Sequence, residues 1–112
     1  LSGLLPFSWK SLSNLRCLSF FGNGFTGSMS VVEAMGSLQL LYLNNNAFSG
    51  TLPTTWGSHR LRVIDISDNL LTGGLPTNQS SYPQILTSFN VSCNSLSGVV
   101  PSAVAYIISE RW

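Results

Sequence analysis

The hydrophobic residues of this chain recur in a fixed arrangement about two dozen residues long. Each copy has apolar residues in the pattern LxxLxLxxNxL, then a Ser or Thr, a Gly and usually Leu-Pro or Val-Pro. A partial copy, LSGLLP, comes first, and four full copies begin at Leu15, Leu38, Leu61 and Leu86. Such a recurrence predicts a stack of similar coils in which each coil covers the hydrophobic face of the next.

The centre of each copy alternates between apolar and polar residues, as in a short β-strand with one buried face. Stacking the copies in phase aligns these strands into a parallel sheet. The residues predicted to point into the core are Leu18 and Phe20, Leu41 and Leu43, Ile64 and Ile66, and Phe89 and Val91. Because each strand is too short to be stable alone, we expect contacts between coils to provide the stability.

One asparagine occupies the same position in every full copy. These residues, spaced 23, 23 and 25 positions apart, are Asn23, Asn46, Asn69 and Asn94. A carboxamide both donates and accepts hydrogen bonds, so we predict a structural Asn ladder that satisfies buried backbone groups where the chain turns inward. The glycines that follow are predicted to form turns with positive φ, and the Leu-Pro or Val-Pro pairs a second extended segment. These glycines are Gly27, Gly50, Gly73 and Gly98.

The pattern LxxLxLxxNxL(S/T)GxLP resembles the plant-type leucine-rich repeat of receptor-like kinases, receptor-like proteins and polygalacturonase-inhibiting proteins. The resemblance extends from Leu1 to Pro101, and FNVSCNSLSGVVP is especially similar to late ectodomain repeats of receptor-like kinases. It implies an α/β leucine-rich-repeat right-handed solenoid, a horseshoe segment with a concave parallel β-sheet and short 3₁₀ turns on the convex side. It also implies an extracellular or cell-surface location, with the parent protein anchored in the plasma membrane.

The repeat boundaries predict a single leucine-rich-repeat domain over residues 1–112. The cysteine-paired caps that close such ectodomains have no counterpart in this sequence, and LSGLLP resembles the middle of a repeat. We therefore expect a fragment of a receptor-like kinase or receptor-like protein ectodomain, in contact with neighbouring repeats of the parent chain. Its expected divisions are a partial repeat over 1–14, repeats at about 15–37, 38–60, 61–85 and 86–106, and an irregular tail over 107–112.

Composition narrows the partners further. Only 8% of residues are charged, the formal net charge is +1, and charges of one sign do not cluster, which disfavours nucleic acid and anionic membranes as partners. The apolar tract from Val99 to Ile108 is interrupted by Pro101, so we expect neither a membrane span nor direct membrane contact from this segment. Cys17 and Cys93 fall three coils apart, about 14 Å, beyond the Cα separation of about 7 Å that a disulfide spans. We predict two free thiols.

Proteins of this type usually bind ligands on the concave face, where outward side chains of successive strands form rows. The rows of this chain combine apolar and aromatic residues with carboxylates, which favours recognition of a protein or peptide, either a ligand or a co-receptor. A purely structural alternative is that Phe21 and Leu40 pack against each other across strands. The candidate binding residues are Phe21, Leu40, Tyr42, Asn44, Val63, Asp65 and Asp68.

Other residues have simpler interpretations. Asn78 and Asn90 begin N-glycosylation sequons, which are meaningful if the chain enters the secretory pathway. Trp9 and Trp56 occupy the same repeat position, three residues after a proline, which indicates packing in the convex side of the core. His59, the only histidine, is predicted to be a solvated loop residue.

No catalytic or metal-binding arrangement emerges from the sequence. One histidine and two distant cysteines do not make a zinc site, which needs several converging ligands. The segment GNGFTG at residues 22–27 matches GxGxxG, but its glycines are explained by the repeat. We therefore expect no cofactor and no enzymatic activity in this chain, and a kinase domain of the parent protein would lie outside it.

These observations predict a non-catalytic protein- or peptide-recognition module from the extracellular region of a plant receptor-like kinase or receptor-like protein. Two alternatives remain open. One is a soluble defence protein similar to polygalacturonase inhibitors, which share the repeat. The other is a truncated fragment with a scaffold role.

Overall fold

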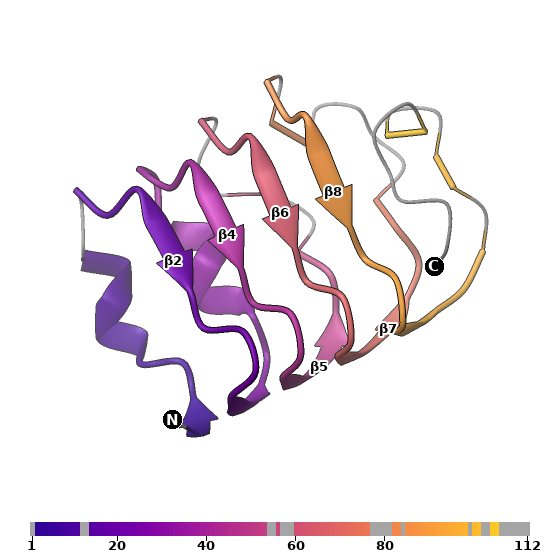
Figure 1. Cartoon of the computed structure of the whole chain (residues 1–112), viewed down its shortest axis with the longest axis horizontal. Helices are drawn as coiled ribbons and strands as arrows, with labels where there is room; N and C mark the ends of the chain where they lie inside the picture. The colour runs from indigo at the N-terminus through magenta and orange to yellow at the C-terminus, as the bar shows by residue number, and fades with distance from the viewer. Residues whose placement is uncertain are drawn as a thin grey trace.

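The computed structural model shows a chain that winds in successive coils, each contributing strands to two parallel sheets (Figure 1). Helix is limited to short 3₁₀ segments within the part of the chain that it describes. This architecture confirms the predicted leucine-rich-repeat solenoid. The described residues are 2–11, 14–53, 56, 60–76, 82–83, 85–98, 100–101 and 104–105.

The first sheet is built from the central strand of each full repeat. Its order is β2-β4-β6-β8, and all neighbouring pairs are parallel, as the strands side by side in Figure 1 show. Equivalent residues of the repeats are aligned one to one, because the coils stack without a shift. The strands are β2 (Cys17–Ser19), β4 (Leu40–Tyr42), β6 (Val63–Asp65) and β8 (Ser88–Asn90).

A second parallel sheet follows each asparagine, in the order β1-β3-β5-β7-β9. The predicted position of this extended segment, at the Leu-Pro pairs, was too late in the repeat. Gly27, Gly50 and Gly73 do have positive φ, 81°, 82° and 81°, but they belong to these strands and not to turns. The strands are β1 (Ser2–Leu4), β3 (Gly24–Gly27), β5 (Ala47–Thr51), β7 (Leu70–Gly73) and β9 (Ser95–Leu96).

The opposite side of the coils carries 3₁₀ helices, η1 (Phe7–Ser11) and η2 (Ser30–Ala34). In Figure 1, η2 lies behind the first sheet and η1 lies beside its β2 edge. In η2 the turn begins with a hydrogen bond from the Val32 N–H to the Met29 carbonyl at 3.0 Å. In η1 and after residue 100 a proline takes the place of Met29, because its carbonyl still accepts a hydrogen bond although it has no N–H to donate. The Pro6 carbonyl accepts from the Trp9 N–H at 3.0 Å, and that of Pro101 accepts from Val104 at 3.2 Å. None of the described helices has the length and hydrophobicity needed to cross a bilayer.

The core lies between the two sheets and the 3₁₀ side. The inward residues of β4, β6 and β8 are fully buried, as the alternation predicts. Phe20, which follows β2 in the first full repeat, is only partly buried. Phe20 stacks on Trp9 with ring centroids 5.2 Å apart, and Trp56 meets Phe89 edge to face at 6.4 Å. The predicted packing role of both tryptophans is confirmed.

Asn46, Asn69 and Asn94 each link their own coil to the one before it. The Asn69 carbonyl oxygen accepts from the Phe48 N–H at 3.0 Å, and its amide group donates to the carbonyls of Leu43, Ile66 and Ser67 at 3.0 to 3.1 Å. Asn46 and Asn94 bond in the same way, accepting from Phe25 and Leu71. The donors to the three carboxamide oxygens are backbone N–H groups of β3, β5 and β7, so the carboxamides position the second sheet. Asn23, in the first full repeat, donates to the Phe21 carbonyl at 3.2 Å in an exposed setting.

Tyr82 gives the fold a pH dependence. Its ring packs edge to face against Phe89 at 5.7 Å, and its hydroxyl donates to the Pro76 carbonyl at 2.7 Å. Burial disfavours the phenolate and raises the pKa of Tyr82 from 10.0 to about 12. Because the unfolded state ionises first, the stabilising contribution of the neutral phenol is complete below about pH 10 and disappears as the pH rises through about 12.

We therefore expect the free energy of unfolding to fall between about pH 10 and 12. Tyr82→Phe removes this dependence and, at neutral pH, costs about 1 kcal/mol through the lost hydrogen bond. Urea unfolding of both proteins from pH 8 to 12 measures the difference. Parallel pH profiles of the two proteins would contradict the assignment to Tyr82.

Both cysteines are free and exposed. Cys17 belongs to β2 and Cys93 follows β8, and these are the two outer strands of the first sheet. The predicted separation of three coils is therefore confirmed, and with it the prediction of two free thiols.

Candidate functional site

The outward side chains of the first sheet and of the turns that follow its strands form one surface, which we call the concave face. Strand pairing places them in rows, because equivalent residues of the coils stand opposite one another. One row crosses β2, β4, β6 and β8. The same alignment continues into the turns, where, for example, the Gly22 N–H donates to the Asn44 carbonyl at 3.1 Å. The members of that row are Ser19, Tyr42, Asp65 and Asn90.

A shallow hollow of about 340 Å³ opens on this face between two adjacent rows. It brings together four residues that the sequence put forward, Phe21, Tyr42, Asn44 and Asp65, and adds Ser19, which stands opposite Tyr42. Sequence reasoning omitted Ser19 from the candidate set, although its place in the same row was a usable signal. The hollow thus combines two aromatic rings, one carboxylate and neutral polar groups, a mixture suited to binding a side chain that is partly apolar and partly charged.

Asp65 is held in one orientation within the hollow. Its Oδ1 accepts from both the N–H and the hydroxyl of Ser67, at 3.2 and 2.7 Å. Asn90, the next residue of the row, is held identically by Ser92, at 3.1 and 2.7 Å. Each serine thus fixes the side chain two positions before it, so the polar end of the concave face is pre-organised.

The remaining candidate binding residues lie beside the hollow. Leu40 and Val63 are directly opposite each other in the preceding row and are half-buried. Asp68 is exposed in the turn after β6, with a left-handed backbone at φ 54°. The alternative in which Phe21 packs against Leu40 is wrong, because Leu40 stands opposite Cys17, whereas Phe21 is level with Asn44.

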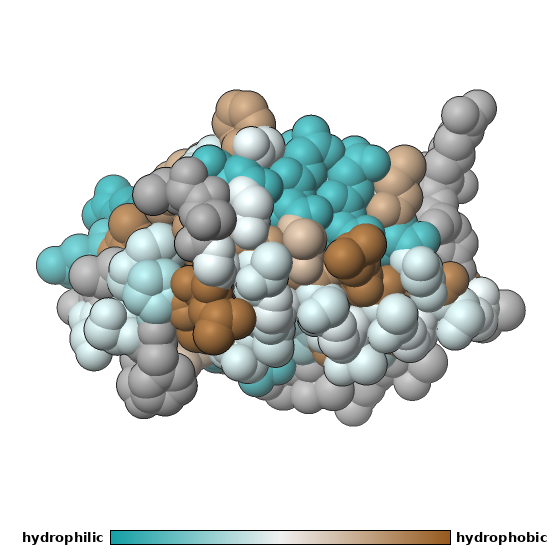
Figure 2. Space-filling model, turned by 90° about the horizontal axis from the view of Figure 1, so that it is seen from below, coloured by the Kyte–Doolittle hydropathy of each residue, from teal (hydrophilic) through white to brown (hydrophobic). Residues whose placement is uncertain are grey.

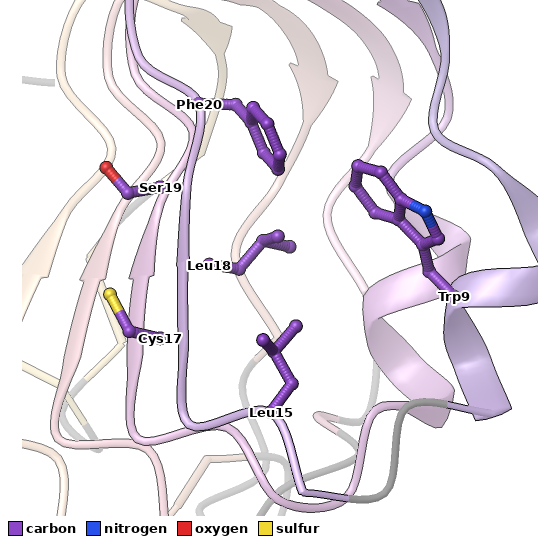
Figure 3. Close-up of a pocket in the computed structure, with 6 residues that line it drawn as sticks. All are labelled: Trp9, Leu15, Cys17, Leu18, Ser19 and Phe20. Atoms are coloured by element: carbon purple, nitrogen blue, oxygen red, sulfur yellow. The ribbon is translucent and has the colours of Figure 1, made fainter.

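A second hollow, an apolar cavity of about 440 Å³, lies at the β2 edge of the first sheet. Figure 3 shows Leu15, Leu18 and Phe20 pointing toward Trp9, while Cys17 and Ser19 point to the other side of the strand. Most of its lining is therefore core side chains at an uncovered end of the stack. It offers packing surface and has no charged group such as Asp65 of the hollow on the concave face.

Exposed apolar groups are otherwise scattered over the described surface. Viewed from below, hydrophobic side chains appear as separate patches among hydrophilic and neutral ones (Figure 2). Phe21, with 62% of its surface exposed, is the aromatic residue among the large exposed apolar side chains, and it lines the concave hollow. The others are Leu4, Leu70 and Ile85.

Three predicted features fall outside the described residues: the sequon asparagine Asn78, the loop residue His59 and the tail over 107–112. Asn90 is described and is half-buried on the concave face. In the described part of the chain, no three His, Cys, Asp or Glu side chains converge in a way that suits a metal ion.

Comparison with known proteins identifies the family. The Leucine Rich Repeat family model matches residues 37–59, 60–81 and 86–107, more than half of the chain. The chain therefore belongs to the leucine-rich-repeat family. A search of curated proteins by sequence gives no match.

Solved structures place the repeats among those of plant receptor ectodomains. A TDR receptor is 28% identical over 92% of this chain, with a TM-score of 0.84. The Arabidopsis receptor kinase HAESA, in complex with the peptide hormone IDA and the co-receptor SERK1, is 31% identical over 94%, with a TM-score of 0.82. The plant peptide hormone receptor RGFR1, in complex with RGF2, is 32% identical over 94%, with a TM-score of 0.84. The repeats are thus of the plant type, and the chain spans 17 to 18% of the length of these proteins.

Proposed function

We propose that this chain is a recognition module from the extracellular ligand- or co-receptor-binding region of a plant receptor-like kinase or receptor-like protein, and that its concave face binds an extended peptide or a protein segment. The observation that carries the proposal is the hollow formed by Phe21, Tyr42 and Asp65. Three successive coils contribute these residues, so a ligand lying across the coils contacts all of them.

The comparisons support this choice of ligand class and setting. Two of the similar ectodomains are complexes with peptide hormones, and one of these also contains a co-receptor. Both belong to plant receptors, which favours an extracellular location here and anchoring of the parent protein in the plasma membrane. Because the chain spans less than a fifth of those proteins, it would supply one stretch of a longer binding surface. Its uncovered core at the β2 edge would then pack against a neighbouring repeat.

Affinity capture tests the proposal directly. The purified chain is immobilised and exposed to peptides and proteins from plant apoplastic fluid, and the retained species are identified by mass spectrometry. We expect the wild-type chain to retain a set of molecules that the double variant Phe21→Ala/Tyr42→Ala loses. Leu70→Ala is the matched control, because Leu70 is 60% exposed but lies on the second sheet. Equal retention by the double variant and the wild type would exclude the concave hollow as the binding site.

The soluble-inhibitor alternative predicts a different outcome. A polygalacturonase-inhibiting protein lowers the release of reducing sugars from polygalacturonan by its target enzyme. Inhibition by the wild-type chain, with no molecule retained in the capture experiment, would replace the receptor proposal with this alternative. The glycosylation prediction for Asn90 matters in both cases, because a glycan there would cover the β8 end of the concave face and restrict ligands to β2, β4 and β6.

A further inference from the structure

We propose that the hollow on the concave face is a site for a cationic side chain, in particular an arginine of a bound peptide, with Asp65 as the counter-charge and Phe21 and Tyr42 as stacking surfaces. This inference rests on the proposed function and specifies the chemistry of its ligand. The geometry and the charge of the hollow carry it.

The first argument is the charge of the hollow. Asp65 is the one ionised group in its lining, so a bound cation meets an unneutralised carboxylate. The Ser67 bonds occupy Oδ1 alone, and the other carboxylate oxygen of Asp65 accepts no hydrogen bond within the described part of the chain. That oxygen is the free acceptor that a guanidinium N–H needs.

The second argument is the aromatic lining. A cation placed over an aromatic face gains electrostatic stabilisation, and a planar guanidinium also stacks on the ring. Phe21 is largely exposed and Tyr42 is half-buried in the same hollow. A single arginine inserted there would cover part of the Phe21 ring with its aliphatic stem and guanidinium plane, which accounts for an exposed aromatic residue in the same hollow as a carboxylate. Lysine lacks the planar group and is expected to bind less well.

The repeat itself supplies suitable variants. Asn90 occupies the Asp65 position of the next coil and makes the same two bonds to its serine, so Asp65→Asn removes the charge and preserves the local structure. Asn45 occupies the Asp68 position of the preceding coil with nearly the same backbone, φ 59° against 54°. Asp68→Asn is therefore a matched control that removes one charge outside the hollow.

The experiment is a titration of the full 112-residue chain, followed by ¹H–¹⁵N NMR, with two small probes. N-acetyl-arginine methylamide carries the cation, and N-acetyl-citrulline methylamide has nearly the same shape without charge. We expect the wild type to bind the arginine probe roughly three- to tenfold more tightly than the citrulline probe. Binding should change the chemical shifts of the backbone amides of Ser67 and Tyr42. Asp65→Asn abolishes this preference, whereas Asp68→Asn retains most of it. Raising the salt concentration weakens the preference in the wild type.

The results separate this inference from the proposed function. The cation-site inference fails if the wild type binds the two probes with equal affinity, or if Asp65→Asn and Asp68→Asn lose the preference for arginine to the same extent. Either result would count against the site even where apoplastic molecules are captured. A charge preference that depends on Asp65 would support the cation site, even if the capture experiment fails and the proposed receptor role falls. The dispersion of each spectrum shows whether a variant is folded. Asp65→Asn is expected to fold, because Asn90 already makes the same two bonds at the equivalent position of the next coil.

Discussion

Replacing Asn69 by alanine is expected to lower the free energy of unfolding by roughly 3 to 5 kcal/mol, because it leaves several buried backbone groups without partners at once. Asn69 is buried and its carboxamide makes four hydrogen bonds, which join the Phe48 N–H to the carbonyls of Leu43, Ile66 and Ser67. Asn69 is only 6% exposed, so solvent offers the stranded groups little substitute for the lost bonds. Urea unfolding followed by circular dichroism measures the loss.

Asn44→Ala is the matched control for this prediction. It makes the same chemical change in the preceding coil, but Asn44 lies on the concave face, where it lines the hollow. We expect its cost to be below about 1 kcal/mol, within the range of ordinary surface substitutions. Similar losses from Asn69→Ala and Asn44→Ala would contradict the view that the asparagine ladder stabilises the stack.

Ile64→Ala is expected to cost roughly 2 to 5 kcal/mol, because it opens a cavity in the middle of the core. Ile64 is completely buried on β6, between Leu41 on one side and Phe89 on the other. The adjacent coils cannot collapse into the space, since their strands are fixed by the ladder of backbone hydrogen bonds. Loss of this side chain weakens two coil interfaces, so the whole stack should unfold at lower denaturant concentration.

Val63→Ala tests whether the side of the strand that a residue faces decides how much stability its truncation costs. Val63 precedes Ile64 in the same strand, but it faces outward and is half-buried. We expect a loss of less than about 1 kcal/mol, since truncation on an open face leaves no enclosed cavity. A loss equal to that of Ile64→Ala would mean that the inward and outward sides of β6 had been assigned the wrong way round.

The repeat made much of the fold predictable. The residues assigned to the core from alternation, such as Leu41 and Ile66, are buried, and the row containing Tyr42 and Asp65 follows from the alignment of the copies. The second sheet was placed too late in the repeat because the sequence reading treated Gly50 as a turn residue. Its positive φ is correct, but the strand continues through it, since Asn69 binds the Phe48 N–H and holds β5 in line with its neighbours.

Some local conformations had a weak signal or none. The position before each ladder asparagine adopts a left-handed backbone, at Asn45, Asp68 and Cys93. Asn and Asp tolerate this region, but nothing in a cysteine predicts it. Cys93 takes the conformation because the coil before it fixes the path of the chain, through the bond from the Asp68 N–H to the Ser92 carbonyl.

The sequence by itself determined the period, the strand that each copy forms, and the asparagine that joins one copy to the next, because these depend on residue types at fixed local spacing. Only the tertiary structure decided which outward side chains share a hollow and how they are oriented. Phe21, Tyr42 and Asp65 come from three different coils, and their proximity depends on how those coils stack. The orientation of Asp65 depends on two hydrogen bonds from Ser67, in a turn whose backbone is bonded to the neighbouring coils at Asn45 and Ser92.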